Sequence, residues 1–344
     1  MEVRVNTLPV RTWNWLSMNE SRIKDLEMPD ALRIESDGAF SSAIPPLPDM
    51  NTGMGIRLDE KVASHPIRVA IPAGDQQKIK VAIRGEAEKR GGQLIEIRAG
   101  RESELTVIME LTGEGQGLMG VQTHLWLEEG AKVRLVQVQL MSSAYRVLQD
   151  IGAYCESNGS LETIQLFLGG SENYSGCYAA LEGEGSRWES DLVYLAQEHQ
   201  RFDLNYVARH RGIRSQSQLK AKGILREHAE KCMRQTIEFV KGAAGAEGTE
   251  QEEVLMLSEN TINRSIPLIL CGEEAVQGNH GASIGRPDEE LLFYMQSRGL
   301  DMEEIYQMLI RGRIEEICRR IQDPETEQKI WSFWEGGGEN ESVS

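Results

Sequence analysis

The sequence lacks several features that would place a protein quickly in a class. It has five cysteines among 344 residues, and no two of them form a Cys-x-x-Cys pair. No apolar run approaches the length needed to cross a bilayer. The first residues also lack the charged-then-apolar order of a secretion signal. We therefore expect a cytoplasmic protein with reduced thiols, and neither a disulfide framework nor a self-contained zinc site.

Positive charge is scarce as well. The chain has 37 Lys plus Arg against 54 Asp plus Glu, which gives a formal net charge of -17. Binding to nucleic acid or to an anionic membrane needs clustered positive charge, so we expect neither as a partner. The sequence contains no Gly-x-x-x-x-Gly-Lys-Ser/Thr loop for phosphates, and we therefore expect no ATPase centre in this chain.

What is present is a long series of short segments in which apolar and polar residues alternate. It runs from about residue 65 to residue 285, with glycine-bearing turns at roughly ten-residue spacing. Alternation with a period of two predicts strands with one buried face. Residues 76–90 have a helical pattern instead, although their glycine-rich end also allows a strand, and a short helix is predicted over residues 19–26.

Such a series suits a sandwich, a propeller or a β-solenoid. No blade motif recurs, which disfavours a propeller, and the series is longer than one sandwich uses. We therefore predict a mainly β protein with a β-solenoid core over residues 66–286. Residues 1–65, rich in proline near residues 45–48, are expected to form an arm packed over that core.

After residue 286 the apolar period becomes helical. Asp288 can cap a helix that Gly299 ends, and Asp301 with Glu304 forms a capping box for the next helix. Pro324 suits the first position of a third helix. We predict a helical region over residues 287–334, whose apolar stripes pack the helices on each other and against the end of the solenoid. Residues 335–344 are expected to be disordered.

The strand series and the helices meet in the stretch from Ile266 to Gly312. A short apolar strand is followed by a predicted polar bend over residues 279–283, which holds His280. Neutral imidazole can ligate iron and can exchange a proton near neutral pH. One histidine cannot hold an iron–sulfur cluster, which needs about four ligands. Cys271, nine residues earlier, is predicted to be a small buried residue like the other four cysteines.

The order of residues here resembles a known family. The run Asn-His-Gly-Ala-Ser-Ile-Gly (279–285), followed by Glu-Leu-Leu-Phe-Tyr-Met-Gln-Ser-Arg-Gly (290–299), resembles the C-terminal signature of the SufB/SufD family. These proteins are scaffold subunits of the SUF iron–sulfur cluster assembly machinery. Residues 6–13 also resemble the opening of many SufD-type chains. The resemblance implies a right-handed parallel β-helix core with an N-terminal segment and a C-terminal helical region.

The resemblance also implies a function. The chain would be a SufD-like scaffold without enzyme activity, paired with a SufB-type subunit and docking a SufC-type ABC ATPase through its C-terminal helices. A transient iron–sulfur cluster would form where the two cores meet, with His280 as a candidate ligand shared with the partner chain. The residues expected to contact a partner are Phe293, Tyr294, Arg298, Gly299, Ile305 and Leu309.

The sequence also departs from the family at three places. SufB-type chains carry a sulfur-accepting cysteine in the stretch that corresponds to residues 249–257, where this chain has none and Gln251 occupies the middle. Gly281 stands where SufB-type chains tend to have glutamate, and Gly278 stands where some SufD-type chains have cysteine. The chain therefore keeps the histidine and lacks its sulfur companion.

Three alternatives remain open from the sequence. The chain could be a homodimeric SUF scaffold. It could also be a carbohydrate-active β-helix enzyme, a lyase or hydrolase with carboxylates or basic residues aligned along one face. Finally, the basic run in the helical region either forms part of a docking face or pairs with neighbouring acids such as Glu315 and Glu316. That run consists of Arg311, Arg313, Arg319 and Arg320.

Overall fold

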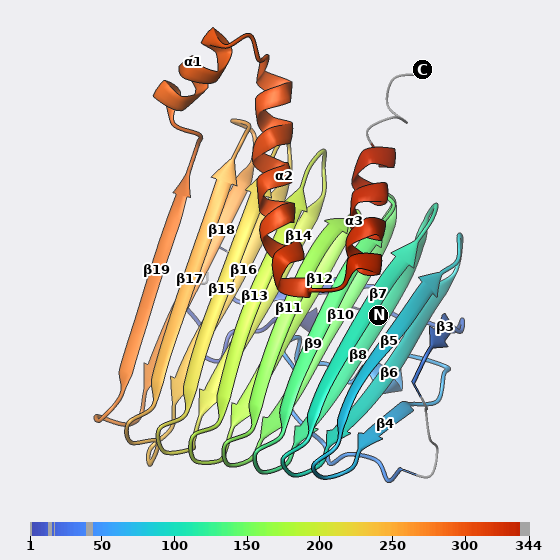
Figure 1. The fold of residues 1–344 in the computed structure, drawn as a ribbon, viewed down its shortest axis with the longest axis vertical. Coiled ribbons are helices and arrows are strands. Elements are labelled where there is room, and N and C mark those ends of the chain that lie inside the picture. Colours follow the sequence, from blue (N-terminus) through green and yellow to red (C-terminus); the bar gives the residue numbers. More distant parts are fainter. Residues whose placement is uncertain (1, 13–15, 17, 39–43, 338–344) are drawn as a thin grey trace.

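The computed structural model describes residues 2–12, 16, 18–38 and 44–337. Two long sheets face each other, and the chain alternates between them strand by strand (Figure 1). Each pair of successive strands makes one coil, and neighbouring coils pair in parallel. The result is the predicted β-solenoid, with about eight turns. The predicted disordered tail lies, apart from its first three residues, outside the described residues.

We call the two layers the even sheet and the odd sheet, after the numbers of their strands. The even sheet contains β4 (Ile67–Ile71), β6 (Arg90–Ala99), β8 (Gly117–Leu127), β10 (Tyr145–Cys155), β12 (Glu172–Leu181), β14 (Arg201–His210), β16 (Glu230–Phe239) and β18 (Ile262–Cys271). The odd sheet contains β3 (Arg33–Ser36), β5 (Gln76–Gly85), β7 (Glu104–Gly113), β9 (Lys132–Met141), β11 (Ser160–Gly169), β13 (Arg187–Ala196), β15 (Gln216–Leu225), β17 (Glu247–Met256) and β19 (Gln277–Gly285). Only β3 joins its sheet antiparallel, along β5.

Two predicted helices proved to be strands. Residues 76–85 form β5 because Ile79, Val81 and Ile83 alternate into the solenoid interior, and this period of two prevails over the helical pattern. Residues 21–24 form β2 (Ser21–Lys24), which pairs antiparallel with β1 (Glu2–Val5) and buries alternate residues. In both segments tertiary burial decided between two local patterns.

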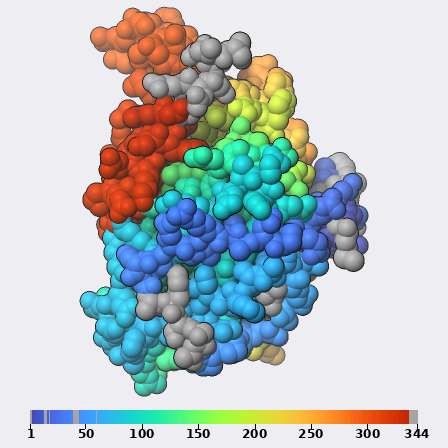
Figure 2. Space-filling view, turned by 90° about the vertical axis from the view of Figure 1, so that its right-hand side faces the viewer, coloured from blue at the N-terminus to red at the C-terminus, as the bar shows by residue number. Residues whose placement is uncertain are grey.

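Most of the described N-terminal segment lies across the outer face of the even sheet, as an arm, whereas its strand β3 joins the odd sheet. Figure 2 shows it as a blue band that crosses the body of the molecule. Apolar residues of the arm, among them Val5, Ile23 and Met28, form a buried cluster with Leu118, Leu148 and Tyr174 of the even sheet. A short 3₁₀ helix, η2 (Leu58–Glu60), belongs to the same layer. The predicted packing arm is thus confirmed.

A buried carboxylate fixes this arm to the sheet. Asp203 of β14 accepts hydrogen bonds from Asn6 (2.7 Å to Nδ2) and from the Ser21 hydroxyl. Its other partner is Arg234 of β16, whose Nη1 lies 2.7 Å from Asp203 Oδ1. Arg234 also donates through Nε to the carbonyl of Met18 in the arm, at 2.8 Å. Asp203 and Arg234 therefore act as a clamp between the arm and two strands.

The α-helices of the described residues are α1 (Glu289–Ser297), α2 (Met302–Ile321) and α3 (Pro324–Gly337). The predicted caps are present: the Asp288 side chain accepts from the Glu290 amide, and Asp301 with Glu304 forms a capping box. Gly299, with a φ of 93°, follows the end of α1. No helix of the described residues is long and apolar enough to span a membrane.

Helices α2 and α3 cover the outer face of the odd sheet (Figure 1), whereas we had expected them to close the end of the solenoid. The buried stripe of α2, which includes Ile310, Ile314 and Ile317, packs against apolar residues of β9, β11 and β13. The odd sheet needs this cover because Val136, Ile164 and similar residues point outward from it. The helices therefore complete a side of the solenoid and leave its end open.

The basic run on α2 is engaged within the chain. Arg320 pairs with Glu162 (2.6 Å) and Asp191 (2.9 Å) of the odd sheet, and Arg313 pairs with Glu253. The remaining two arginines, Arg311 and Arg319, both lie near Glu315 on the helix itself, at 3.4 and 3.9 Å. These contacts favour the pairing alternative, and they show that two of the arginines fix α2 to the sheet.

Candidate site at the open end of the solenoid

The last coil, β18 and β19, has neighbours on one side only. In the described residues nothing pairs with the outer edge of either strand, and every residue of β19 is exposed. Open edges of this kind are templates for another chain, because their amide and carbonyl groups lack partners. Ile262 and Ile284 of this coil are 38% and 45% exposed.

His280 lies on this last coil, within β19, where a polar bend had been predicted. The segment is a strand because residues 277–285 follow β17 in parallel register. In that register His280 is opposite Glu250, and paired residues of neighbouring strands point to the same face. Since Glu250 points into the solenoid, His280 occupies the interior-facing side of the last coil and is exposed only because no further coil covers it.

Glu250 is the residue directly beneath His280. Its side chain is 1% exposed, and neither carboxylate oxygen has a hydrogen-bond partner. Burial, together with the nearby charge of Glu252, raises the pKa of Glu250 from 4.5 to about 8. Because this pKa is higher in the folded than in the unfolded chain, the unfolded chain releases this proton first, and the fold loses stability progressively as the pH rises from about 4.5 to 8.

The neighbouring acid, Glu252, is compensated. It pairs with Lys231, a fully buried lysine of β16 that also donates to Ser265 Oγ (3.0 Å) and to the carbonyl of Arg264 (3.2 Å). Burial lowers the pKa of Lys231, and the charge of Glu252 opposes that shift. This pair ties the odd sheet to the even sheet immediately below the open end.

Cys271 is exposed, contrary to the prediction that it is buried. It ends β18 in register with Phe239, whose side chain lies in a buried cluster of the interior. Cys271 therefore lies on the interior-facing side of the last coil, as His280 does, and lacks only a covering coil. The other four cysteines are buried as predicted, and burial raises the pKa of Cys155 to about 12, which keeps that thiol unreactive.

The three positions at which this sequence departs from the family have different surroundings. A Cβ added at Gly278 would lie 2.9 Å from Ile269 Cγ2 and 3.1 Å from Phe239 Cε2, so a cysteine there would require repacking. Nothing lies within 4 Å of a Cβ at Gly281, so a larger side chain would fit. Gln251 is exposed on the outer face of β17. No group of three His, Cys, Asp or Glu side chains in the described residues is arranged to hold a metal ion.

The residues expected to contact a partner fall into two groups. Phe293 and Tyr294 of α1 are 74% and 56% exposed, and Arg298 lies over the Tyr294 ring, 5.2 Å from its centroid. None of the residues in α1 is buried, and Figure 1 shows this helix beyond the end of β19. By contrast, Ile305 is fully buried, and Leu309 is half-buried against the cluster beneath α2.

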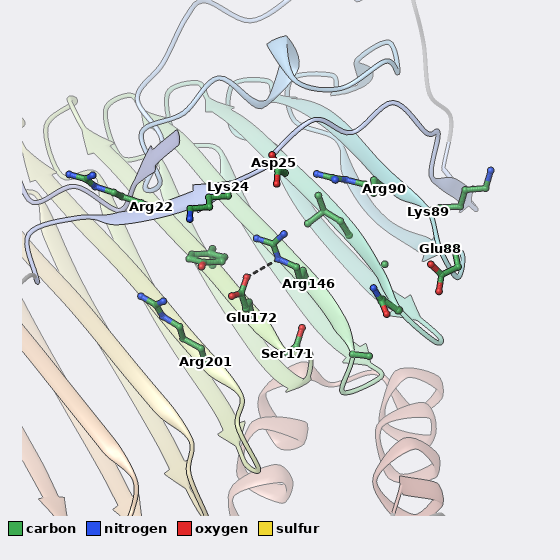
Figure 3. Close-up of a pocket in the computed structure, with 15 residues that line it drawn as sticks. Arg22, Lys24, Asp25, Glu88, Lys89, Arg90, Arg146, Ser171, Glu172 and Arg201 are labelled. Carbon is green, nitrogen blue, oxygen red and sulfur yellow. Dashed lines mark hydrogen bonds and ion pairs between the residues drawn. The ribbon is translucent and has the colours of Figure 1, made fainter. Parts of the chain in front are cut away.

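A basic cleft lies between the arm and the even sheet (Figure 3), and no pattern in the sequence indicated it. It has a volume of about 690 Å³. Arg146 pairs with Glu172 at 2.7 Å, and Arg201 stands in register beside that glutamate. The cleft contains no histidine or cysteine, and it lies on the outer face of the sheet, whereas His280 faces inward. Its cationic side chains come from separate segments: Arg22, Lys24, Lys89, Arg90, Arg146 and Arg201.

Comparison with known proteins agrees with this architecture. Residues 84–313 match the family model of the SufBD core domain, described as SUF system FeS cluster assembly. The chain belongs to the SufBD family. Among curated relatives, SufD of Bacillus subtilis is 27% identical over 151 residues, which are 44% of this chain and 34% of that protein. SufB of the same organism is 25% identical over 197 residues, 57% of this chain and 42% of that protein.

A plant relative gives the same result. The chloroplastic iron–sulfur cluster assembly SufBD family protein ABCI8 of Arabidopsis thaliana is 23% identical over 208 residues, 58% of this chain and 37% of that protein. The chain thus matches less than half the length of each of these relatives. SufB and SufD are matched about equally well, so the comparison establishes the family and leaves the subunit type to be proposed. It also favours an assembly component over a carbohydrate-active enzyme.

Proposed function

We propose that this chain is a SufD-like scaffold subunit of a cytoplasmic SUF complex. It pairs with a SufB-type subunit through its last coil, docks a SufC-type ABC ATPase through its C-terminal helices, and has no enzyme activity of its own. The iron–sulfur cluster is a transient cargo at the junction of the two subunits. The observation that carries this proposal is the open end of the solenoid. Within the described residues both sheets finish there in a strand whose outer edge is unpaired, and His280 lies exposed on the interior-facing side of the last coil.

The composition of the last coil supports the SufD-like assignment. Neither the stretch around Gln251 nor the position of Gly278 supplies a thiol, so the chain offers His280 with at most the exposed Cys271 on that side. A cluster needs about four ligands. A partner that continues both sheets would cover the last coil and could supply the rest. A second copy of this chain would bring the same sparse ligands, which makes a SufB-type partner the better fit.

The first helix supports the docking assignment. Because α1 buries none of its residues and projects beyond the solenoid, the fold itself does not need its apolar side chains. Exposed aromatic residues of this kind are frequent energetic centres of protein interfaces. Arg298 and Gly299 belong to the same surface. Ile305 is buried and Leu309 is partly buried against the cluster beneath α2, so these two residues are less available to a partner.

The test uses the double variant Phe293→Ala/Tyr294→Ala, co-expressed with the ATPase and the SufB-type subunit. We expect the amount of ATPase retained by an affinity tag on this chain to fall at least tenfold, since truncating two such aromatics costs about 2 kcal/mol or more. The SufB-type subunit should be retained as before. Ile213→Ala, at another exposed apolar residue, in the turn after β14, is the control. Undiminished ATPase in the double variant would contradict docking through α1.

A further inference from the structure

Glu250 differs from the other buried carboxylates of the described residues. Asp150 accepts from Gln122 and from the Met54 amide, each at 2.8 Å. Asp203 is held by Arg234, and Glu252 by Lys231. The remaining members of the set are also paired: Glu96 with Arg68, Glu110 with Thr326 and Lys329, and Asp323 with Lys78 and Lys80. Both oxygens of Glu250 lack any such partner.

Two other unpartnered polar atoms lie on the last two strands of the even sheet. Gln235 of β16 points inward, in register with the interior residue Tyr206, and its amide nitrogen has no acceptor. Asn263 of β18 points inward above Lys231, and its Oδ1 has no donor. Buried polar atoms without partners are uncommon and call for an explanation such as a bound ion. Further atoms of this kind occur elsewhere in the solenoid, but among the described residues Glu250 contributes the only carboxylate oxygens in this set, and it lies directly beneath His280.

We propose that Glu250 and His280 form a two-donor site that receives ferrous iron at the open end of the solenoid. The inference rests on the proposed function, because the iron is the cargo of the assembly. Imidazole nitrogen and carboxylate oxygen together are a suitable donor pair for Fe²⁺. Neighbouring strands lie about 4.8 Å apart, so the two stacked side chains can reach one ion. Water and the partner subunit would supply the other ligands.

Packing alone does not explain why the fold buries the Glu250 carboxyl group without hydrogen-bond partners. A carboxyl group buried without hydrogen bonds opposes folding. A metal ion would replace the proton of the Glu250 carboxyl and provide the missing partner for its oxygens. If Glu250 served packing alone, a neutral side chain of the same size would fill the position as well. Glu250→Gln separates these two roles.

The experiment is an anaerobic calorimetric titration of the full chain with Fe²⁺, with the ligand-field absorption of bound Co²⁺ as a second readout. We expect Glu250→Gln and His280→Ala each to weaken Fe²⁺ binding at least tenfold. Glu247→Gln, at an exposed acid of the same strand, should bind as the wild type does. The thermal midpoint of Glu250→Gln should be unchanged or higher, which shows that the loss is not caused by misfolding.

Two results would overturn the inference. One is Glu250→Gln binding Fe²⁺ as tightly as the wild type. The other is the absence of saturable Fe²⁺ binding by the wild-type chain, both alone and with the SufB-type subunit. Co-purification of the same variants keeps the two proposals apart. A complex that forms normally while Glu250→Gln has no effect on iron refutes only the site, and a chain that loses iron on substitution without ever pairing refutes only the scaffold role.

Discussion

Replacing Arg234 by leucine is expected to lower the free energy of unfolding by about 3–5 kcal/mol. Arg234 and Asp203 are both 1% exposed and pair at 2.7 Å. Removal of the arginine leaves the Asp203 carboxylate buried without its counter-charge, and it also removes the donor to the Met18 carbonyl. Urea unfolding followed by circular dichroism measures the loss. We also expect faster proteolysis of the arm, because Asn6 and Ser21 are held by the same carboxylate.

The matched control is Arg101→Leu. Arg101 pairs with Glu129 at a similar distance, 2.6 Å, but its side chain is 65% exposed. Exposed ion pairs contribute about 0–1 kcal/mol, so this variant should lose at most that amount. The double variant Arg234→Leu/Asp203→Leu should regain only part of the loss, since it removes the uncompensated charge but leaves Asn6 and Ser21 without their acceptor. Equal losses in Arg234→Leu and Arg101→Leu would show that the clamp has no special role.

Replacing Ile284 by aspartate is expected to weaken pairing with a SufB-type subunit at least a hundredfold. Ile284 lies on the interior-facing side of β19, in register with Val254, and it is 45% exposed in the free chain. A partner that continues the solenoid would bury it. Aspartate would then be a buried charge without a partner, which costs several kcal/mol, and each 1.4 kcal/mol is a factor of ten in affinity.

Ile213→Asp provides the comparison for this second variant. Ile213 is 44% exposed in the turn between β14 and β15, away from the last coil. Both variants should fold like the wild type, because both positions are open to solvent. Affinity is measured by titrating the SufB-type subunit into each chain. Normal pairing by Ile284→Asp would mean that the last coil is not the pairing surface.

The solenoid could be predicted from the sequence because its signals are local. Alternation with a period of two, the Asp288 cap and the Asp301–Glu304 capping box each depend on residues within a few positions. The helix predicted over residues 76–90 was wrong for a related reason. Two local patterns overlap there, and only the packing of Ile79, Val81 and Ile83 against other coils decides between them.

The site could be predicted only in part. His280 was found through its family resemblance, but its position on a strand follows from pairing with β17, about thirty residues earlier in the chain. The run Thr249-Glu250-Gln251-Glu252-Glu253 looks like a solvated acidic stretch. Register alone shows that Glu250 and Glu252 point inward while Gln251 and Glu253 point outward. Cys271 is exposed because no further coil covers β18, and Ile305 is buried because α2 packs within the fold. Neither outcome can be read from the neighbouring residues in the sequence.

The iron and acid-labile sulfide content of the complex tests the scaffold role and the part of His280 in cluster binding. The chain is co-expressed with the SufB-type subunit and the ATPase, and the purified complex is reconstituted anaerobically. We expect one complex that contains all three proteins and binds a cluster. In His280→Ala we expect the loss of most of that cluster with the complex intact. A chain that elutes alone, or a His280→Ala complex with a full cluster content, would contradict these expectations.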